Sequence, residues 1–302
     1  MEYLRTLASP QLRDPVLIAA FEGWNDASEV ATFALRDLAD QWSVRKMAEI
    51  DAEEFYVFTE TRPYVRITGH LQRRIEWPGN EFYYHIDRNG KRDLVLLIGV
   101  EPQLKWRTFA DVVASFCQRH GINTVVTIGG LVGDVPHTLP ASLTGNARPD
   151  WLARRLRRLG VASTRYEGPT GILGVLTAAC ARRRMATASI WGQVPEYLSA
   201  SPNPRVSLAI IERLRNLLGF SVDLADAKRL VAEFDRQVTE ILAENPELQA
   251  YVQELEEQEQ AERHEEERPK QMGEEPLPSG EEIVREVEAF LRRRHRGQRG
   301  RT

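Results

Sequence analysis

The sequence contains few of the residues that build disulfide frameworks and metal sites. Only two cysteines, Cys117 and Cys180, occur in 302 residues, and the six histidines are scattered singly along the chain. Neither cysteine has a partner at CxxC or zinc-ligand spacing, so we expect two buried free thiols. The chain also lacks a Walker loop, an HExxH pair and an EF-hand pattern. These absences lead us to expect no metal ion and no cofactor.

Long apolar runs and a marked excess of one charge are missing as well. No stretch approaches the length that crosses a bilayer, and the first fifteen residues lack the apolar core and cleavage site of a signal peptide. The 40 Lys and Arg residues against 44 Asp and Glu residues give a formal net charge of −4, which provides no overall basic field for nucleic acid. We therefore expect a cytoplasmic protein that binds neither nucleic acid nor a membrane.

What the sequence does contain is an alternation of short apolar runs and helical patterns. Residues 15–21 form an apolar run between polar residues, which is typical of a strand buried on both faces, and a helical pattern follows it. Strand and helix patterns are paired again at 93–121 and 123–160, and a helical pattern at 170–184 precedes an apolar run at 186–192. Since strands joined through helices by right-handed crossovers form parallel sheets, we predict an α/β fold, a three-layer sandwich with a mostly parallel sheet.

Residues 44–87 depart from this alternation. They contain four stretches rich in β-branched and aromatic residues, and no convincing helical pattern. Such a region predicts an antiparallel extension or a hairpin.

The composition shifts again at "SPNPR" (201–205), after which helical patterns dominate. Asn245 is expected to cap the last of these helices, with Pro246 at its first position, where a missing N–H costs least. We predict three parts, namely an α/β core domain at 1–201, a helical extension at 202–263 that is packed on the core or projects from it, and a charged flexible tail at 264–302 with a short amphipathic helix.

Polar residues gather where the predicted strands end. Ligands of an open parallel sheet bind beyond the carboxyl ends of its strands, and the segments 22–26, 99–106, 129–140 and 191–197 fall at such ends. A fifth segment, 166–174, begins a helix, whose free N–H groups can receive an anion. We expect 129–140 to be too broken for helix or strand. The predicted cleft residues are Glu22, Asn25, Asp26, Gly129, Gly130, Asp134, His137, Thr170, Gly171 and Gln193.

These residues allow two interpretations. In the first, Asp134 and His137 supply acid–base chemistry, the helix start at 170–171 holds an oxyanion, and Asn25 or Gln193 orients the ligand. In the second, the glycines serve tight turns, Asp134 caps a turn and His137 lies on the surface. Since no serine or cysteine occupies a nucleophile elbow, we prefer the second interpretation and assign no catalytic residue.

Two further residues in these segments, Trp24 and Glu101, are expected to have structural roles. We expect Trp24 to pack as a hydrophobic staple in front of a helix that Asn25 or Asp26 caps. Glu101 is interpreted as part of a turn at the end of a strand.

Four of these motifs, taken in order, resemble a known family. "FEGWNDA", "GGLVGDVPHTLP", "GPTGILGVL" and "WGQVPEYL", followed by a charged helical tail, are similar to the bacterial branch of the proteasome assembly chaperone 2 family, over about residues 15–244. The resemblance implies a phosphorylase/hydrolase-like α/β sandwich and self-association into a homo-oligomer. It also implies an actinobacterial type of protein for which no catalytic residue can be transferred.

Two functions follow as hypotheses. The first is a non-catalytic binding protein, an assembly chaperone or adaptor, with proteasome subunits as a candidate partner. Relatives in that role use a C-terminal motif of an apolar residue, a tyrosine and any residue, whereas this sequence ends "RGRT", which weakens the case for direct proteasome binding. The alternative is a small-molecule hydrolase or phosphorylase-like enzyme that uses the loops at the carboxyl ends of the strands.

Overall fold

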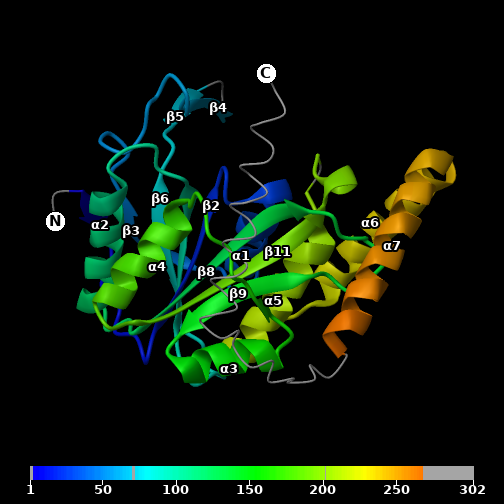
Figure 1. The fold of residues 1–302 in the computed structure, drawn as a ribbon. Helices are drawn as coiled ribbons and strands as arrows, with labels where there is room; N and C mark the ends of the chain where they lie inside the picture. The colour runs from blue at the N-terminus through cyan, green and yellow to red at the C-terminus, as the bar shows by residue number, and fades with distance from the viewer. Residues whose placement is uncertain (1–2, 70–71, 201, 268–302) are drawn as a thin grey trace, which may run out of the picture. The chain divides into compact units, whose positions relative to one another are not determined.

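The structure is a computed structural model that describes residues 3–69, 72–200 and 202–267, with the backbone alone for 262–267. Residues 1–258 form one compact unit and residues 259–302 a second. In the first unit, helices flank one large sheet, which confirms the predicted α/β class (Figure 1). No helix in the described part of the chain combines the length and apolar character that a bilayer crossing requires.

The sheet has nine strands and is mixed. Its central strands β7, β2, β8 and β11 are parallel, whereas β1, β3 and β6 run antiparallel on one side and β9 lies antiparallel to β11 on the other. The prediction of a mostly parallel sheet therefore holds for the central strands and is wrong outside them. β3 and β6 are connected without the helical crossover that parallel strands need, so they pair antiparallel. In spatial order the strands are β1 (Leu4–Thr6), β3 (Arg45–Ile50), β6 (Asn80–His85), β7 (Leu94–Val100), β2 (Val16–Glu22), β8 (Thr124–Gly133), β11 (Ala186–Pro195), β9 (Leu143–Arg148) and β10 (Ala162–Ser163).

Helices cover both faces of this sheet. One face packs against α1 (Val30–Gln41), α3 (Asp150–Arg158) and α5 (Pro204–Leu218), and the other against α2 (Trp106–Arg119) and α4 (Ile172–Arg182). Along β2, Val16, Ile18 and Ala20 join the first core while Leu17, Ala19 and Phe21 join the second, all at 1% exposure or less. Burial on both faces explains why the sequence of this strand is apolar throughout.

The region 44–87 forms the predicted antiparallel elements. β3 and β6 pair with each other inside the large sheet. Between them, β4 (Tyr64–Thr68) and β5 (Gln72–Glu76) form a separate two-stranded sheet, which stands apart from the helices in Figure 1.

The helical patterns after residue 203 are confirmed. α6 (Ala225–Ala243) and α7 (Pro246–Glu267) follow α5, with two short 3-10 turns elsewhere at Ala27–Glu29 and Glu196–Leu198. The Asn245 side chain accepts a hydrogen bond from the Leu248 amide at 3.1 Å, so Asn245 caps α7 as predicted.

Candidate functional site at the carboxyl edge of the sheet

The carboxyl ends of β7, β2, β8 and β11 meet at one edge of the sheet, which we call the carboxyl edge. There the Asn25 amide, 1% exposed, donates a hydrogen bond of 2.6 Å to Oε1 of Glu101. The same carboxylate oxygen accepts the Ile172 amide at 2.8 Å, in the first turn of α4. Glu101 therefore links three connections that are distant in sequence, those after β2 and β7 and the one before α4.

The negative charge at the N-terminus of α4 is thus supplied by a side chain of the protein itself, Glu101. Free amides and the helix dipole favour a negative charge at such an end, and the Glu101 carboxylate occupies this position. The sequence pattern predicts the helix start, but the interpretation of Glu101 as part of a turn misses this role. An acid directly after a strand that ends at the same edge as a helix N-terminus is the signal that could have identified it.

Gly171 lies against the side chain of Asn25. A Cβ atom at position 171 would fall 2.1 Å from Asn25 Oδ1, an approach that real Cβ atoms do not show, so only glycine fits here. Asn25 Oδ1 has no hydrogen-bond partner among the described residues. The neighbouring Thr170 is exposed, and its hydroxyl donates to the Gly171 carbonyl at 3.4 Å.

The Asp26 side chain holds the start of α1, so of the two predicted capping residues, Asn25 and Asp26, it is the second that fills this role. Its Oδ1 accepts the Ala31 amide at 2.7 Å, and its other oxygen accepts the Thr32 hydroxyl. Burial raises the pKa of this carboxyl, while its hydrogen bonds to Thr32 and Ala31 act in the opposite direction. At 6% exposure, Asp26 is a capping residue with little access to a ligand.

Gly129 and Gly130 belong to a strand. β8 continues to Gly133 and pairs with β11 to Pro195, so the expectation that 129–140 is too broken for a strand is wrong for its first five residues. A Cβ atom at Gly129 would lie 2.6 Å from the Trp191 ring, and one at Gly130 would lie 2.5 Å from Val30. The two glycines therefore permit close packing rather than tight turns.

His137 lies in a different environment from Asp134. The His137 amide donates to the Tyr197 hydroxyl at 2.8 Å, and Nδ1 lies 2.6 Å from the same oxygen. Burial lowers the pKa of His137, with Arg205 adding to the effect. Asp134 is exposed, and no hydrogen bond joins it to His137 in the described part of the chain. His137 itself is 9% exposed, so the prediction that it lies on the surface is wrong.

The remaining two predicted cleft residues point elsewhere. Glu22 forms an ion pair with Arg36 of α1. The backbone N–H of Gln193 donates to the Ser142 carbonyl at 3.0 Å, and its side chain lies within 4 Å of the position that a Cβ atom on Gly133 would take. The structure therefore brings together Asn25, Asp26, Gly129, Gly130, Thr170 and Gly171, and leaves Glu22, Asp134, His137 and Gln193 outside this cluster.

Two aromatic side chains are exposed on the loops that meet at Asn25 and Gly171. Trp24 directly precedes Asn25, and Tyr166 donates its hydroxyl to the Pro169 carbonyl at 3.0 Å, two residues before Gly171. Both side chains are 66% exposed, so the prediction that Trp24 packs as a hydrophobic staple is wrong. We call these segments, 23–26 and 164–171, the aromatic loops.

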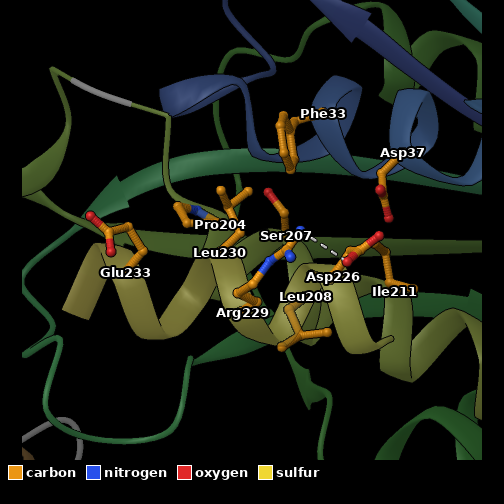
Figure 2. A pocket seen from close by; sticks show the side chains of 11 residues that line it. Phe33, Asp37, Pro204, Ser207, Leu208, Ile211, Asp226, Arg229, Leu230 and Glu233 are labelled. Carbon is orange, nitrogen blue, oxygen red and sulfur yellow. Dashed lines mark ion pairs between the residues drawn. The ribbon is translucent and has the colours of Figure 1, made fainter. Parts of the chain in front are cut away.

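Two grooves lie apart from the aromatic loops. A cavity of about 440 Å³ is lined by residues of α1, α5 and α6, and Figure 2 shows Phe33 and Asp37 of α1 pointing toward Leu230 and Asp226. A larger groove of about 1550 Å³ lies between the β4–β5 hairpin and the strands β3 and β6. Among the described residues, no group of three His, Cys, Asp or Glu side chains is placed to hold a metal ion.

Comparisons with known proteins agree with this architecture. The PAC2 family matches residues 20–242. A proteasome-assembly chaperone homologue from Mycobacterium tuberculosis is 38% identical, covers 78% of this chain and 99% of its own, and has a TM-score of 0.71. A PAC2 family protein from Streptomyces avermitilis is 36% identical over 79% of this chain and 100% of its own, also at a TM-score of 0.71. An archaeal proteasome activator from Pyrococcus furiosus, 19% identical over 80% of this chain and 99% of its own, has a TM-score of 0.64. No curated protein sequence matches the chain.

Proposed function

This chain belongs to the PAC2 family, and on that premise we propose that it is a non-catalytic binding protein, an assembly chaperone or adaptor that holds a protein partner at its carboxyl edge. The observation that carries the proposal is the exposure of Trp24 and Tyr166 on two loops that Glu101 and Asn25 hold together. Tryptophan and tyrosine supply much of the binding energy in protein interfaces. Loops held in place before binding lose little conformational entropy when a partner arrives.

The internal contacts of the carboxyl edge support binding rather than chemistry. Glu101 accepts from Asn25 and Ile172, and Asp26 accepts from the first turn of α1, so these carboxylates hold the loops. The alternative, a small-molecule hydrolase or phosphorylase-like enzyme, needed Asp134 and His137 to act together. His137 instead shares a hydrogen bond with Tyr197, and Asp134 is exposed, which favours the binding protein over the enzyme.

Proteasome subunits are the partner that we propose to test first. One solved relative is described as a proteasome-assembly chaperone homologue and a more distant one as a proteasome activator. Their names suggest the class of partner, and the exposed aromatic loops suggest where on this chain it would bind.

The test measures binding of the full chain to purified proteasome α subunits of the same host by biolayer interferometry. We expect Trp24→Ala and Tyr166→Ala each to weaken binding about thirtyfold or more, because truncating an interface hot spot costs about 2 kcal/mol or more. Trp151→Ala is the matched control, since Trp151 is 51% exposed on α3. The proteasome assignment fails if the unaltered chain does not bind, and the assignment of the site fails if both loop variants bind as tightly as the control.

A further inference from the structure

Helix α3 carries a concentration of positive charge that the composition of the whole chain hides. Between residues 146 and 165 the sequence has six arginines and one acid, although the chain as a whole has a formal net charge of −4. Four of the arginines belong to α3 itself, namely Arg154, Arg155, Arg157 and Arg158. All four are exposed, while Leu152 and Leu156 of the same helix pack into the core. The solvent side of α3 is therefore strongly basic.

Three of these side chains have no partner among the described residues. Arg155 donates to the Asn216 carbonyl at 3.2 Å and so joins α3 to α5. Arg154, Arg157 and Arg158 form no ion pair and no side-chain hydrogen bond in the described part of the chain. Arg157 and Arg158 follow Arg154 by three and four positions, so like charges lie on neighbouring turns, which destabilises a helix. We call these three residues the arginine face.

The helix dipole explains only part of this pattern. The negative C-terminal end of a helix favours basic residues in the last turn, where Arg155, Arg157 and Arg158 lie. Arg154 lies in the middle of the helix instead. Arg148, also exposed, just precedes the helix, where the positive end of the dipole disfavours a cation. The excess of arginine is therefore not accounted for by the stability of α3.

We propose that the arginine face binds an acid-rich segment of another protein. Guanidinium groups donate paired hydrogen bonds to carboxylates, and arginine is enriched in protein interfaces. The carboxylates of such a segment also remove the repulsion among the three arginines. The site is separate from the aromatic loops, because β9 leads into α3 at the opposite edge of the sheet, where Arg148 pairs with Thr187 near the start of β11. It does not depend on the function proposed above.

Two other anionic partners fit these observations less well. A membrane-surface helix buries its apolar side among lipids, but the apolar side of α3 is already in the protein core, with Leu152 and Leu156 each 2% exposed. A long nucleic acid would extend past α3 over a molecule whose net charge is negative. A short acidic segment needs only the length of α3, which is nine residues or about 14 Å.

The test is a titration of a fluorescein-labelled decaglutamate peptide with the full chain, followed by fluorescence anisotropy at low and at physiological salt. We expect saturable binding by the unaltered chain that weakens as salt is added, because salt screens exposed charges. In Arg154→Glu/Arg158→Glu the dissociation constant should rise about tenfold or more, since two attractive contacts become repulsive.

Arg182→Glu/Arg184→Glu is the matched control. These two arginines are exposed at the end of α4, on the other face of the sheet, and the change in net charge is the same. The control should bind the peptide nearly as tightly as the unaltered chain. Arg154→Gln/Arg158→Gln replaces the charge reversal if that variant has a lowered melting temperature, because it adds no acid near the C-terminal end of the helix. It should weaken binding as well.

Three results would overturn the proposal. The first is an unaltered chain that does not bind the peptide at low salt. The second is the same affinity in the α3 variants and in the control pair, because binding would then respond to net charge alone or to another surface. The third is tighter binding of a labelled oligothymidine of the same charge than of the peptide, which would identify a surface for nucleic acid instead.

Discussion

Asn25 and Gly171 are packed so closely that the amide of the first excludes any side chain at the second. The Asn25 oxygen lies 2.1 Å from the position of a Cβ atom on Gly171. We expect Gly171→Ala to lower the free energy of unfolding by about 1–3 kcal/mol through overpacking, measured by urea denaturation. In an Asn25→Ala background the same substitution should cost less, since the overlapping group is gone. Gly69→Ala, where the added atom meets nothing within 4 Å, is the control and should change stability little.

Removing the Glu101 carboxylate should loosen the aromatic loops. Glu101→Ala leaves the buried Asn25 amide and the Ile172 N–H without their acceptor, which costs about 1–3 kcal/mol. Hydrogen exchange at Ile172 and in residues 23–26 should become faster, and denaturation should report the loss of stability. Glu167→Ala removes an exposed acid from the loop before α4 and should change neither measurement. Equal effects of the two substitutions would contradict the role that we assign to Glu101.

Acidification should lower the stability of the folded chain through His137. Burial lowers the pKa of His137 below its ordinary 6.5, and Arg205 of α5 adds to this, while Asp235 of α6 and Glu256 of α7 act in the opposite direction. The unfolded chain therefore takes up the proton first, and the stabilising contribution present above pH 6.5 is lost as the pH falls below it. We expect the free energy of unfolding, measured by urea denaturation, to fall between pH 7 and 5.

His137→Gln is the variant that isolates this effect. Its free energy of unfolding should fall less than that of the unaltered chain over the same pH interval. His85 and His120 also have lowered pKa values because of burial, so both chains keep the pH dependence that those residues contribute. If the free energy of unfolding falls equally in both chains, His137 is not the group responsible.

The two cysteines should be unreactive in the folded protein. Cys117 of α2 and Cys180 of α4 are both buried, as the sequence predicted. The hydrogen bond that Cys117 donates to Cys180, together with burial, raises the pKa of the Cys117 thiol, and the same bond lowers the pKa of Cys180, which burial keeps away from solvent. Since the thiolate is the reactive form, we expect a disulfide reagent to label them only at the rate of unfolding. Gln118→Cys, which adds an exposed thiol beside Cys117, should react at once.

Much of the fold could be predicted because strands buried on both faces have a simple pattern. β2, β7, β8 and β11 were all identified from apolar runs, and the four stretches at 44–87 became β3 to β6. β9 was missed. Its sequence, "LTGNAR", contains one large apolar residue and a glycine, and the strand forms only because it pairs with β11. Tertiary pairing, rather than local propensity, determines that strand.

The location of the candidate site could be predicted, but the hydrogen bonds that join its loops could not. The rule for open sheets directed attention to the carboxyl edge, where Asn25 and Gly171 do meet. The hydrogen bond between Asn25 and Glu101 spans 76 positions in sequence, and no local pattern reports it. The four ordered motifs proved the most informative signal, since the PAC2 family match confirms the resemblance that they carried.

The position of Glu101 has a mechanical consequence. Its carboxylate accepts hydrogen bonds from both sides, from Asn25 next to Trp24 and from Ile172 at the end of the segment that carries Tyr166. We therefore expect the two loops to open together or not at all. A displacement of either aromatic side chain would then be transmitted to the first turn of α4 through the Glu101 side chain. A partner that touches only one of the two loops would in this way immobilise both.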